Sequence, residues 1–380
     1  MRYVAVSRIE THAFRVPLTV PVETSFGIMR DRPAVFLRIE DEQGVFGWGE
    51  IFANWPSAGA EHRARLALED IAPLLLGSDA RQPRHVFRDL MRKTRIRALQ
   101  CGEFGPFWQA IAGIDTALWD LNARAEGQPL RRLLNPGAAD SIPVYASGID
   151  NRKAHAGIAG ARQAGHEAFK LKVGFDECDA GRVQDQAKDL GTHEALYLDA
   201  NQAWSREQAA DFLSRIEGCP IGWLEEPIAA DAGEAQWRDL AEVSTIPLAG
   251  GENVAGASNF QSLIESRVLS FVQPDVAKWG GVSGCFDVAR QVIDAGLTYC
   301  PHFLGGGIGL LASAELLAAS GGPGSLEVDV NPNPLRDAFP VPAVVQGSMR
   351  LGDGPGLSVE RLPDSLDPYR TFRGEVSQSS

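Results

Sequence analysis

The sequence predicts an α/β fold in which a TIM-like barrel of alternating strands and helices is joined to a separate α+β domain. Residues 1–60 alternate apolar and polar side chains, as antiparallel strands do, and residues 61–136 change to helical spacing. From about residue 142 onward, short apolar strands alternate with amphipathic segments of helical length, which is the pattern of a parallel barrel. A chain of 380 residues is long enough for both parts.

The first domain contains strand-like runs followed by helical runs. VAVSRIETHAF and AVFLRIEDEQGVFGWGEI read as strands, with DEQG as a turn. HRARLALEDIAPLLLG and IAGIDTALWDLNARAEGQPLRRLL place apolar residues three and four apart. We expect this α+β domain to span residues 1–136 and the barrel to span 137–340. The Pro- and Gly-rich segment 341–380, with the strand-like run MRLGDGPGLSVE, is expected to return to the first domain.

The barrel prediction rests on eight apolar runs, each of which except the last precedes a helical segment. They are IPVYAS (142–147), AFKLKV (168–173), ALYLDA (195–200), GWLEEP (222–227), PLAGGE (247–252), LSFVQPD (269–275), TYCPH (298–302) and SLEVD (325–329). Parallel strands joined by helices are what a (β/α)₈-type barrel requires.

Charge and composition narrow the function classes. The formal net charge of −13 disfavours nucleic acid and anionic membranes as partners, because a phosphate-binding face needs clustered Lys and Arg. The five cysteines show no CxxC spacing and read as buried thiols in a reducing compartment. Neither a signal peptide nor a long uncharged apolar stretch is visible, so we expect a cytoplasmic protein with a small-molecule substrate.

A charged or ligand-type residue ends one barrel strand after another. Successive members of this series lie 23 to 27 residues apart, about one strand and helix, and they are Lys172, Asp199, Glu225, Glu252, Asp275, His302 and Glu327. Active sites of barrels lie at the carboxyl ends of the strands and take residues from several of them. The alternative, that each is a solvated loop residue, leaves the repeated position to chance. The series therefore predicts one site.

Three carboxylates in this series predict a metal site. Asp199, Glu225 and Glu252 come from consecutive strands, and oxygen ligands without Cys or paired His suit Mg²⁺ or Mn²⁺. Without a cation, mutual repulsion would raise their pKa values. Asn201 and Glu226, beside them in the sequence, are interpreted either as supporting groups or as plain loop residues.

Two further pairs suggest proton transfer. Lys170 and Lys172 share one face of a strand, and neighbouring ammonium groups would lower each other's pKa and make a neutral lysine available as a base. An exposed strand with two solvated lysines is the alternative. Asp275 and His302 end adjacent strands, where the carboxylate would fix the imidazole tautomer and leave the other nitrogen free to move protons.

These motifs together resemble the enolase superfamily, mandelate racemase subgroup. The resemblance rests on FKLKVG, YLDANQAW, WLEEP, GGENV, QPDVAKWGG, PHFLGGG and LEVD, in order after AIAGIDTALWDLNARAEGQPLRRLL, and covers nearly the whole chain. It implies a modified (β/α)₇β barrel with an α+β capping domain made from both termini, and a homo-oligomer. The muconate-cycloisomerase and dipeptide-epimerase branch is also similar, but has a lysine base where this sequence has Asp275.

The resemblance also implies residue roles. Asp199, Glu225 and Glu252 become Mg²⁺ ligands, and Lys172 and His302, oriented by Asp275, become the acid and base on opposite faces of the substrate. Lys170 would help neutralise the substrate carboxylate, and Glu327 would hydrogen-bond it as the enolate forms. Lys278, three residues after Asp275, is interpreted as a supporting or structural residue and not as that branch's base.

The predicted activity is removal of a proton α to a carboxylate, through an enolate stabilised by the cation. The resemblance favours dehydration of a sugar acid or related hydroxy acid, with racemisation or epimerisation of an α-hydroxy acid as the alternative. It also implies that the cap loops, Thr24 to Arg32 and Phe52 to Ser57 in this sequence, choose the substrate. Arg30 and Arg32 would suit polar groups, or lie in a solvated turn, and Phe26, Ile28 and Trp55 would suit apolar ones.

Two other classes of function stay open at this point. A non-catalytic binding protein on the same fold would have lost a ligand or base, and all seven positions are intact. A barrel lyase would use Lys172 or Lys170 as a Schiff-base nucleophile.

Overall fold

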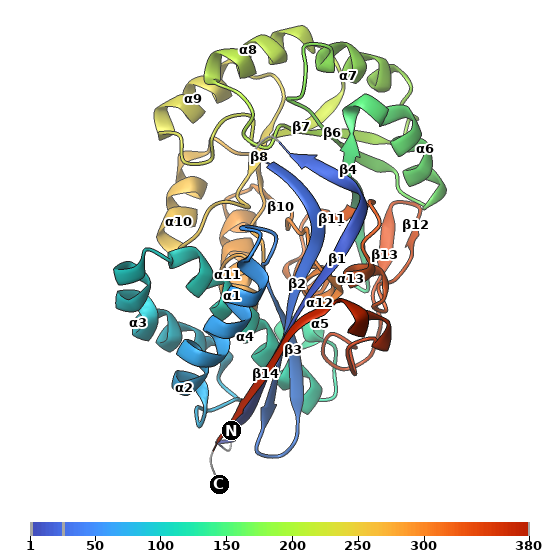
Figure 1. Cartoon of the computed structure of the whole chain (residues 1–380). Coiled ribbons are helices and arrows are strands. Elements are labelled where there is room, and N and C mark those ends of the chain that lie inside the picture. The colour runs from blue at the N-terminus through green and yellow to red at the C-terminus, as the bar shows by residue number, and fades with distance from the viewer. Residues whose placement is uncertain (1–2, 25–26, 379–380) are drawn as a thin grey trace.

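The structure is a computed structural model that describes residues 3–24 and 27–378. It has a strand-and-helix cap domain beside a barrel (Figure 1). In the cap, β1 (Val6–Thr24), β2 (Gly27–Asp41) and β3 (Phe46–Ile51) form an antiparallel sheet, with a turn at Asp41 to Gly44 between β2 and β3. Three α-helices and a short π-helix follow: α1 (Gly59–Leu66), η1 (Ala67–Ile71), α2 (Ala72–Leu75) and α3 (Pro83–Cys101).

The long helix α4 (Phe104–Ala125) packs on this sheet, and α5 (Leu130–Leu134) leads to the barrel. Apolar residues recur every three to four positions along α4, so most of its surface is buried. The odd-numbered residues Ile9, Val35, Leu37 and Ile39 face these helices in one apolar core. Because side chains alternate along a strand, one face of the sheet packs on the cap helices and the other face is directed toward the barrel.

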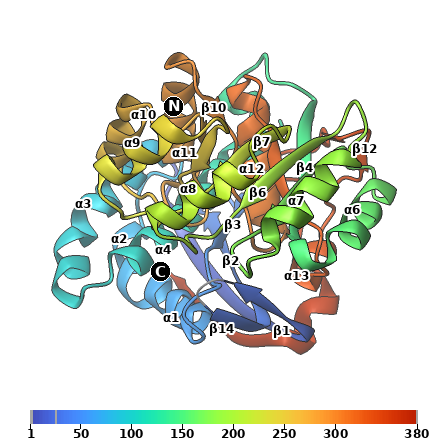
Figure 2. The same ribbon diagram turned by 90° about the horizontal axis from the view of Figure 1, so that it is seen from above.

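The barrel has the (β/α)₇β order. Its strands are β4 (Ser141–Asp150), β5 (Ala168–Lys172), β6 (Ala195–Asp199), β7 (Ile221–Glu225), β8 (Leu248–Gly250), β9 (Phe271–Val272), β10 (Thr298–Tyr299) and β11 (Leu326–Asp329). The connecting helices are α6 (Ala154–Gln163), α7 (Asp179–Lys188), α8 (Arg206–Arg215), α9 (Glu234–Val243), α10 (Ala257–Ser266), α11 (Gly281–Asp294) and α12 (Gly307–Ser320). β4 pairs in parallel with both β5 and β11, and the helices surround the strands (Figure 2). The predicted fold class and all eight predicted strands are confirmed.

The C-terminal segment touches both parts of the molecule. After the short helix α13 (Pro334–Asp337), β12 (Val344–Val345) and β13 (Ser348–Arg350) extend the barrel sheet through β4. The strand-like run MRLGDG thus starts on the barrel, not on the first domain as expected. Beyond it, Leu357 N–H bonds Asp120 of α4, and β14 (Arg370–Ser377), which follows the 3₁₀ helix η3 (Asp364–Tyr369), pairs with β1 of the cap.

Two smaller expectations concern the burial of the cysteines and membrane-spanning helices. All five cysteines have free thiols, but Cys101 and Cys178 are exposed, so only Cys285 and Cys300 match the expected burial. Within the described residues, no helix combines the length and apolar character needed to cross a bilayer.

Substitution of one core leucine tests the barrel packing. Leu198 on β6 is fully buried between the barrel and its helices, whereas Leu99 on α3 is 52% exposed. Leu198→Ala is expected to lower the free energy of unfolding by about 2–5 kcal/mol, because it removes apolar contacts and leaves a cavity. Leu99→Ala should change it by less than about 0.5 kcal/mol. Urea denaturation checks both, and equal losses would contradict this packing.

Candidate active site

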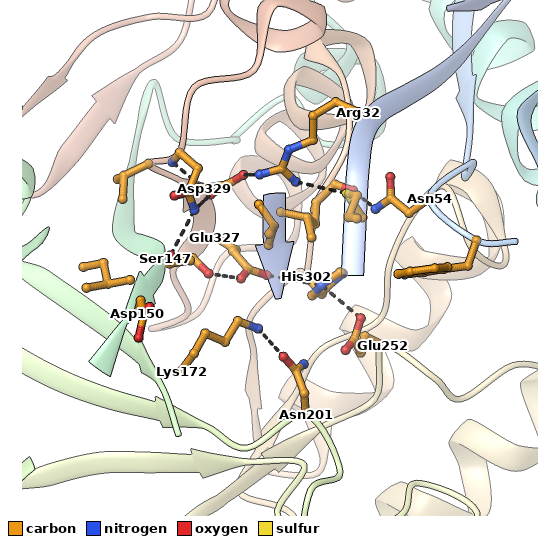
Figure 3. Close-up of a pocket in the computed structure, with 18 of the residues that line it drawn as sticks. Arg32, Asn54, Ser147, Asp150, Lys172, Asn201, Glu252, His302, Glu327 and Asp329 are labelled. Carbon is orange, nitrogen blue, oxygen red and sulfur yellow. Dashed lines mark hydrogen bonds and ion pairs between the residues drawn. The ribbon is translucent and has the colours of Figure 1, made fainter. Parts of the chain in front are cut away.

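The residues at the strand ends meet at one mouth of the barrel, beneath the cap. A cleft with a volume of about 1780 Å³ is lined there by Lys172, Glu252, His302 and Glu327 from the barrel. Arg32, Asn54 and Trp55 of the cap line it from the other side. The volume exceeds the roughly 300–1,000 Å³ of a typical ligand pocket, which leaves room for an extended substrate. Figure 3 shows Lys172 and His302 entering the cleft from different sides.

Lys170 and Lys172 both face the inside of the barrel. The Lys170 ammonium is completely buried and lies 2.8 Å from carboxylate oxygens of Glu225 and Glu327. The Lys172 ammonium bonds Asp199 and the side-chain oxygen of Asn201, the latter at 2.8 Å. These lysines are therefore not solvated residues of an exposed strand.

The expected lowering of the lysine pKa values is wrong for this structure. Burial has the largest effect on Lys172 and lowers its pKa, and Lys170 lowers it further. The carboxylates around it, Asp199 above all, together raise the pKa above its usual value. Burial likewise opposes the charge on Lys170, whereas Glu225 and Glu327 raise its pKa strongly. Both lysines are held as ammonium ions, so the carboxylates around them decide when Lys172 can accept a proton.

The three predicted metal ligands lie side by side, with Asp199 and Glu225 buried and Glu252 half-buried. Asp199 and Glu225 are register partners on β6 and β7, and Glu252 follows β8. Among residues 3–24 and 27–378, no group of three or more His, Cys, Asp and Glu side chains is arranged to hold a metal ion. Instead, each of the three carboxylates contacts a cationic side chain: Lys170 and Lys172, or Lys278 and His302. The sequence predicted their neighbourhood, but not this pairing.

The donor set nevertheless fits a divalent cation. Six carboxylates gather at this mouth against three lysines and one histidine: Asp199, Glu225, Glu226, Asp275 and Glu327, which are buried, and Glu252, which is half-buried. The predicted rise in pKa is wrong for Asp199 and Glu252: burial raises both, but their lysine and histidine neighbours together lower them below the usual values. Burial and the nearby Asp199 do raise the pKa of Glu225 to about 7, and burial and Glu252 raise that of Glu226 to about 8. Such an excess of buried negative charge is what a hard, oxygen-seeking dication compensates.

His302 and Asp275 form the predicted pair. Nδ1 of the imidazole lies 2.8 Å from Asp275 Oδ2, and the two residues pair as a parallel bridge. Nε2 lies 3.0 Å from Glu252 and 3.6 Å from Glu327. Burial opposes charge on His302, but Glu252 and Glu327 raise its pKa well above the usual value. His302 is therefore prepared to donate a proton.

The other predicted supporting residues touch the same network. Besides Lys172, Asn201 contacts Asp199, whose side chain accepts a hydrogen bond from the Asn201 backbone N–H at 2.8 Å. Glu226 accepts from the side chain of Asn253, and Lys278 donates to Glu252 at 2.7 Å while its ammonium lies 4.9 Å from the centre of the Phe52 ring. Asn201 and Lys278 also line the cleft.

The substrate-loop predictions have different outcomes. Phe26 lies outside the described residues. Arg30 is exposed on β2, so the structure does not bring it to the cleft. Arg32 is also on β2, not in a solvated turn; it is buried and bonds Asp329 at 2.8 Å. Trp55 is half-buried in the cleft wall. The region from Gly27 onward is thus a strand of the β1–β2 hairpin rather than a loop.

The sequence analysis missed two side chains in contact with the site. Gln273 donates to Glu225 at 2.7 Å, and the Ser147 hydroxyl donates to Glu327. Gln273 lies two residues before Asp275, and Ser147 is the last residue of the predicted first strand, 142–147, within β4. Strand alternation along QPD would have found Gln273, because it puts residues two apart on the same face. Extension of the strand-end series to β4 would have found Ser147.

Arg32 and Arg30 provide a matched test of the cap wall. Arg32→Met removes a cationic partner of the buried Asp329, which keeps Arg336 at 3.7 Å and hydrogen bonds from Asn331. Removal of one partner of a buried ion pair costs about 3–5 kcal/mol. Arg30→Met, at an exposed position, is expected to change stability by less than about 0.5 kcal/mol. Thermal unfolding of both variants checks this. Equal effects would show that the Arg32–Asp329 contact does not join cap to barrel.

The chain has a (β/α)₇β barrel, a cap made from both termini, and a network of charged residues at the strand ends. These features define a class of barrel enzyme. Comparison with known proteins identifies the family. Residues 153–365 match the family described as enolase C-terminal domain-like. Residues 8–135 match the mandelate racemase / muconate lactonizing enzyme N-terminal domain. The chain belongs to the enolase superfamily, mandelate racemase/muconate lactonizing enzyme group, as its motifs predicted.

Two solved structures and one curated relative are similar to this chain over nearly its whole length. A mandelate racemase/muconate lactonizing enzyme from Bordetella bronchiseptica is 44% identical, with a TM-score of 0.88 and coverage of 96% of this chain and 99% of that one. An L-talarate dehydratase from Polaromonas, solved with Mg and L-glucarate, is 25% identical, with a TM-score of 0.85 and coverage of 98% and 99%. The D-galactarolactone cycloisomerase of Agrobacterium fabrum is 28% identical and covers 96% of this chain and 98% of its own length.

Proposed function

We propose that this enzyme removes the α-proton of a small carboxylic acid and that the overall reaction is dehydration of a sugar acid or related hydroxy acid. One observation carries the proposal: Lys172 on β5 and His302 after β10 line the same cleft, and three carboxylates come from the intervening β6, β7 and β8. A base and an acid are thus separated by a cluster of negative charge.

Asp199, Glu225 and Glu252 are the residues that would hold Mg²⁺, with Mn²⁺ as a substitute. When bound, the cation supplies positive charge where the enolate develops. Because Asp199 raises the Lys172 pKa more than Glu225 or Glu327 does, positive charge that compensates Asp199 would lower that pKa and favour the neutral amine. The chain therefore links cation binding to formation of its base.

The remaining roles follow from contacts. Neutral Lys172 would take the α-proton, and the electrons of that C–H bond would form the enolate. For dehydration, His302, protonated and oriented by Asp275, would give a proton to the β-hydroxyl, which leaves as water. Lys170 would offset charge on the substrate carboxylate. Glu327 would donate a hydrogen bond to it in its protonated form, which burial favours and which Lys170 and His302 oppose by lowering the Glu327 pKa. The enol product then becomes a 2-keto-3-deoxy acid.

Racemisation or epimerisation is the second candidate, and it uses the same two groups. If His302 returns a proton to the α-carbon on the face opposite Lys172, the substrate is inverted instead of dehydrated. The names of the similar proteins, a dehydratase with L-glucarate and a galactarolactone cycloisomerase, support sugar-derived acids as substrates.

The test is incubation of the protein with Mg²⁺ in deuterated water and a library of sugar acids and α-hydroxy acids. Deuterium at the α-carbon supports α-proton removal, and a keto acid detected with semicarbazide supports dehydration. The absence of both across the library would contradict the proposal. Borohydride treatment with substrate tests the Schiff-base alternative, since a trapped lysine adduct would indicate nucleophilic lysine chemistry instead.

A homo-oligomer and a cytoplasmic location are further parts of the proposal. Light scattering on the purified protein tests the first, and localisation of the tagged chain tests the second.

A further inference from the structure

Two buried carboxylates of the cap each reach the start of a barrel helix. Glu50 of β3 accepts hydrogen bonds from the backbone N–H groups of Gly306 and Gly309, the latter at 2.8 Å, where α12 begins. Asp115 of α4 accepts from the backbone N–H and the hydroxyl of Ser283, both at 2.7 Å, in the first turn of α11. The first N–H groups of a helix have no partner within it and favour negative charge. The cap thus provides these partners.

These are the helices that directly follow the acid–base pair. Asp275 lies between β9 and α11, and His302 lies between β10 and α12. Five residues separate Asp275 from Gly281, and four separate His302 from Gly307. Because these connections are short, a shift of either helix start would move its member of the pair.

The glycines of QPDVAKWGG and PHFLGGG fit this arrangement. Gly281 has a φ of +54°, and a Cβ there would lie 2.6 Å from an Asp115 oxygen and 2.7 Å from the backbone oxygen of Ala112. A Cβ on Gly306 would lie 2.7 Å from the Phe36 ring and 3.0 Å from Glu50 Oε1. Both glycines allow the cap to approach so closely that its carboxylate reaches the helix.

The strand that carries Glu50 continues to the same two segments. Phe52 N–H donates to the Ala277 backbone oxygen at 3.3 Å, two residues after Asp275. The Asn54 side chain donates to the Leu304 backbone oxygen at 2.8 Å, two residues after His302. The cap therefore touches each segment at two points, at the helix start and beside the acid–base residue.

We propose that Glu50 and Asp115 are positioning residues for the Asp275–His302 pair, so that docking of the cap sets the geometry of one of the two proton-transfer groups. The cap would then complete the acid–base machinery on the His302 side and leave the Lys172 side, on β5, to the barrel alone. Only the catalytic consequence rests on the proposed function; the positioning itself is a property of the fold.

Alanine substitutions test this proposal. Burial raises the pKa of Glu50 to about 8 and that of Asp115 to about 7, so alanine, which removes the acceptor in either protonation state, is more informative than an amide. The control is Asp120→Ala: Asp120 is also buried on α4 and accepts from the backbone N–H groups of Trp48 and Leu357, neither of them on α11 or α12.

The first readout is the imidazole nitrogen resonances of His302 in histidine-labelled protein at fixed pH, assigned with His302→Asn. Glu50→Ala and Asp115→Ala are expected to shift them, and Asp120→Ala is not. The second readout is the rate of the step assigned to His302, which is keto-acid formation for dehydration and α-deuterium exchange on its face for inversion. This rate should fall about 10-fold or more, since small misplacements of a reacting group slow catalysis strongly. The Lys172-dependent rate should not change.

Unshifted His302 resonances in both variants would overturn the proposal, and so would equal shifts in Asp120→Ala, which would indicate general loosening. If neither carboxylate variant folds, Asn54→Ala replaces them, since it removes the contact with Leu304. It must produce a smaller shift of the same resonances. The absence of that shift would count equally against the proposal. If the wild-type protein exchanges no acid, the proposed function fails, but the resonances still decide the positioning.

Discussion

His302→Asn is expected to lower the rate of the step on its side of the substrate by roughly 10²–10⁴-fold, the usual contribution of a positioned acid or base. Asparagine keeps a polar side chain of similar reach but cannot carry the proton that the imidazole moves. Exchange of the α-proton that persists in this variant is assigned to Lys172. The measurement is deuterium incorporation at the α-carbon, followed by NMR, together with keto-acid formation.

The control for this variant is His193→Asn, because His193 is exposed and remote from the cleft. It should retain wild-type rates. Full dehydration and exchange in His302→Asn would show that His302 moves no proton in the reaction, whatever its contacts.

Lys172→Met is expected to remove exchange on the opposite side, again by roughly 10²–10⁴-fold. Methionine keeps much of the length and apolar stem of lysine but has no proton acceptor of comparable basicity. The same deuterium measurement, made on the substrate that the wild-type protein accepts, reports the effect. Lys188→Met is the matched control, since the Lys188 side chain is 72% exposed on α7.

Together the two variants must give complementary results. If Lys172→Met and His302→Asn each abolish exchange on both sides equally, the two groups do not act as independent bases, and the assignment of faces is wrong. If only one of them matters, the reaction uses a single base.

Most of the fold follows from local sequence patterns. Each barrel strand is a short buried apolar run, such as Ala195–Asp199, and the helices between them have amphipathic spacing, so both kinds of element are visible without tertiary information. β14 could not be recognised in this way, because its residues alternate between half-buried and exposed and its strand identity depends on pairing with β1, more than 300 residues earlier. The β1–β2 hairpin likewise depends on pairing.

The site likewise has features that the local sequence predicts and features that depend on contacts between distant segments. Strand-end spacing located Lys172, Asp199 and His302 at one mouth, because the carboxyl ends of parallel strands meet there. It could not give the protonation of Lys172, since two lysines on one face suggest mutual repulsion while the fold places Asp199 against the ammonium. It also could not show that Asp329, from the last barrel strand, pairs with Arg32 of the cap. Contacts between distant segments decide charge states, and spacing alone does not reveal them.

Calorimetric titration of Mg²⁺ into the metal-free protein tests the central claim most directly. We predict saturable uptake at a single site in the wild-type chain, and its loss in a variant with Asp199→Asn, Glu225→Gln and Glu252→Gln, each of which keeps the shape of the side chain but removes its charge. The absence of uptake by the wild-type protein, or unchanged uptake by a folded triple variant, would contradict the claim that these carboxylates hold the cation on which the reaction depends.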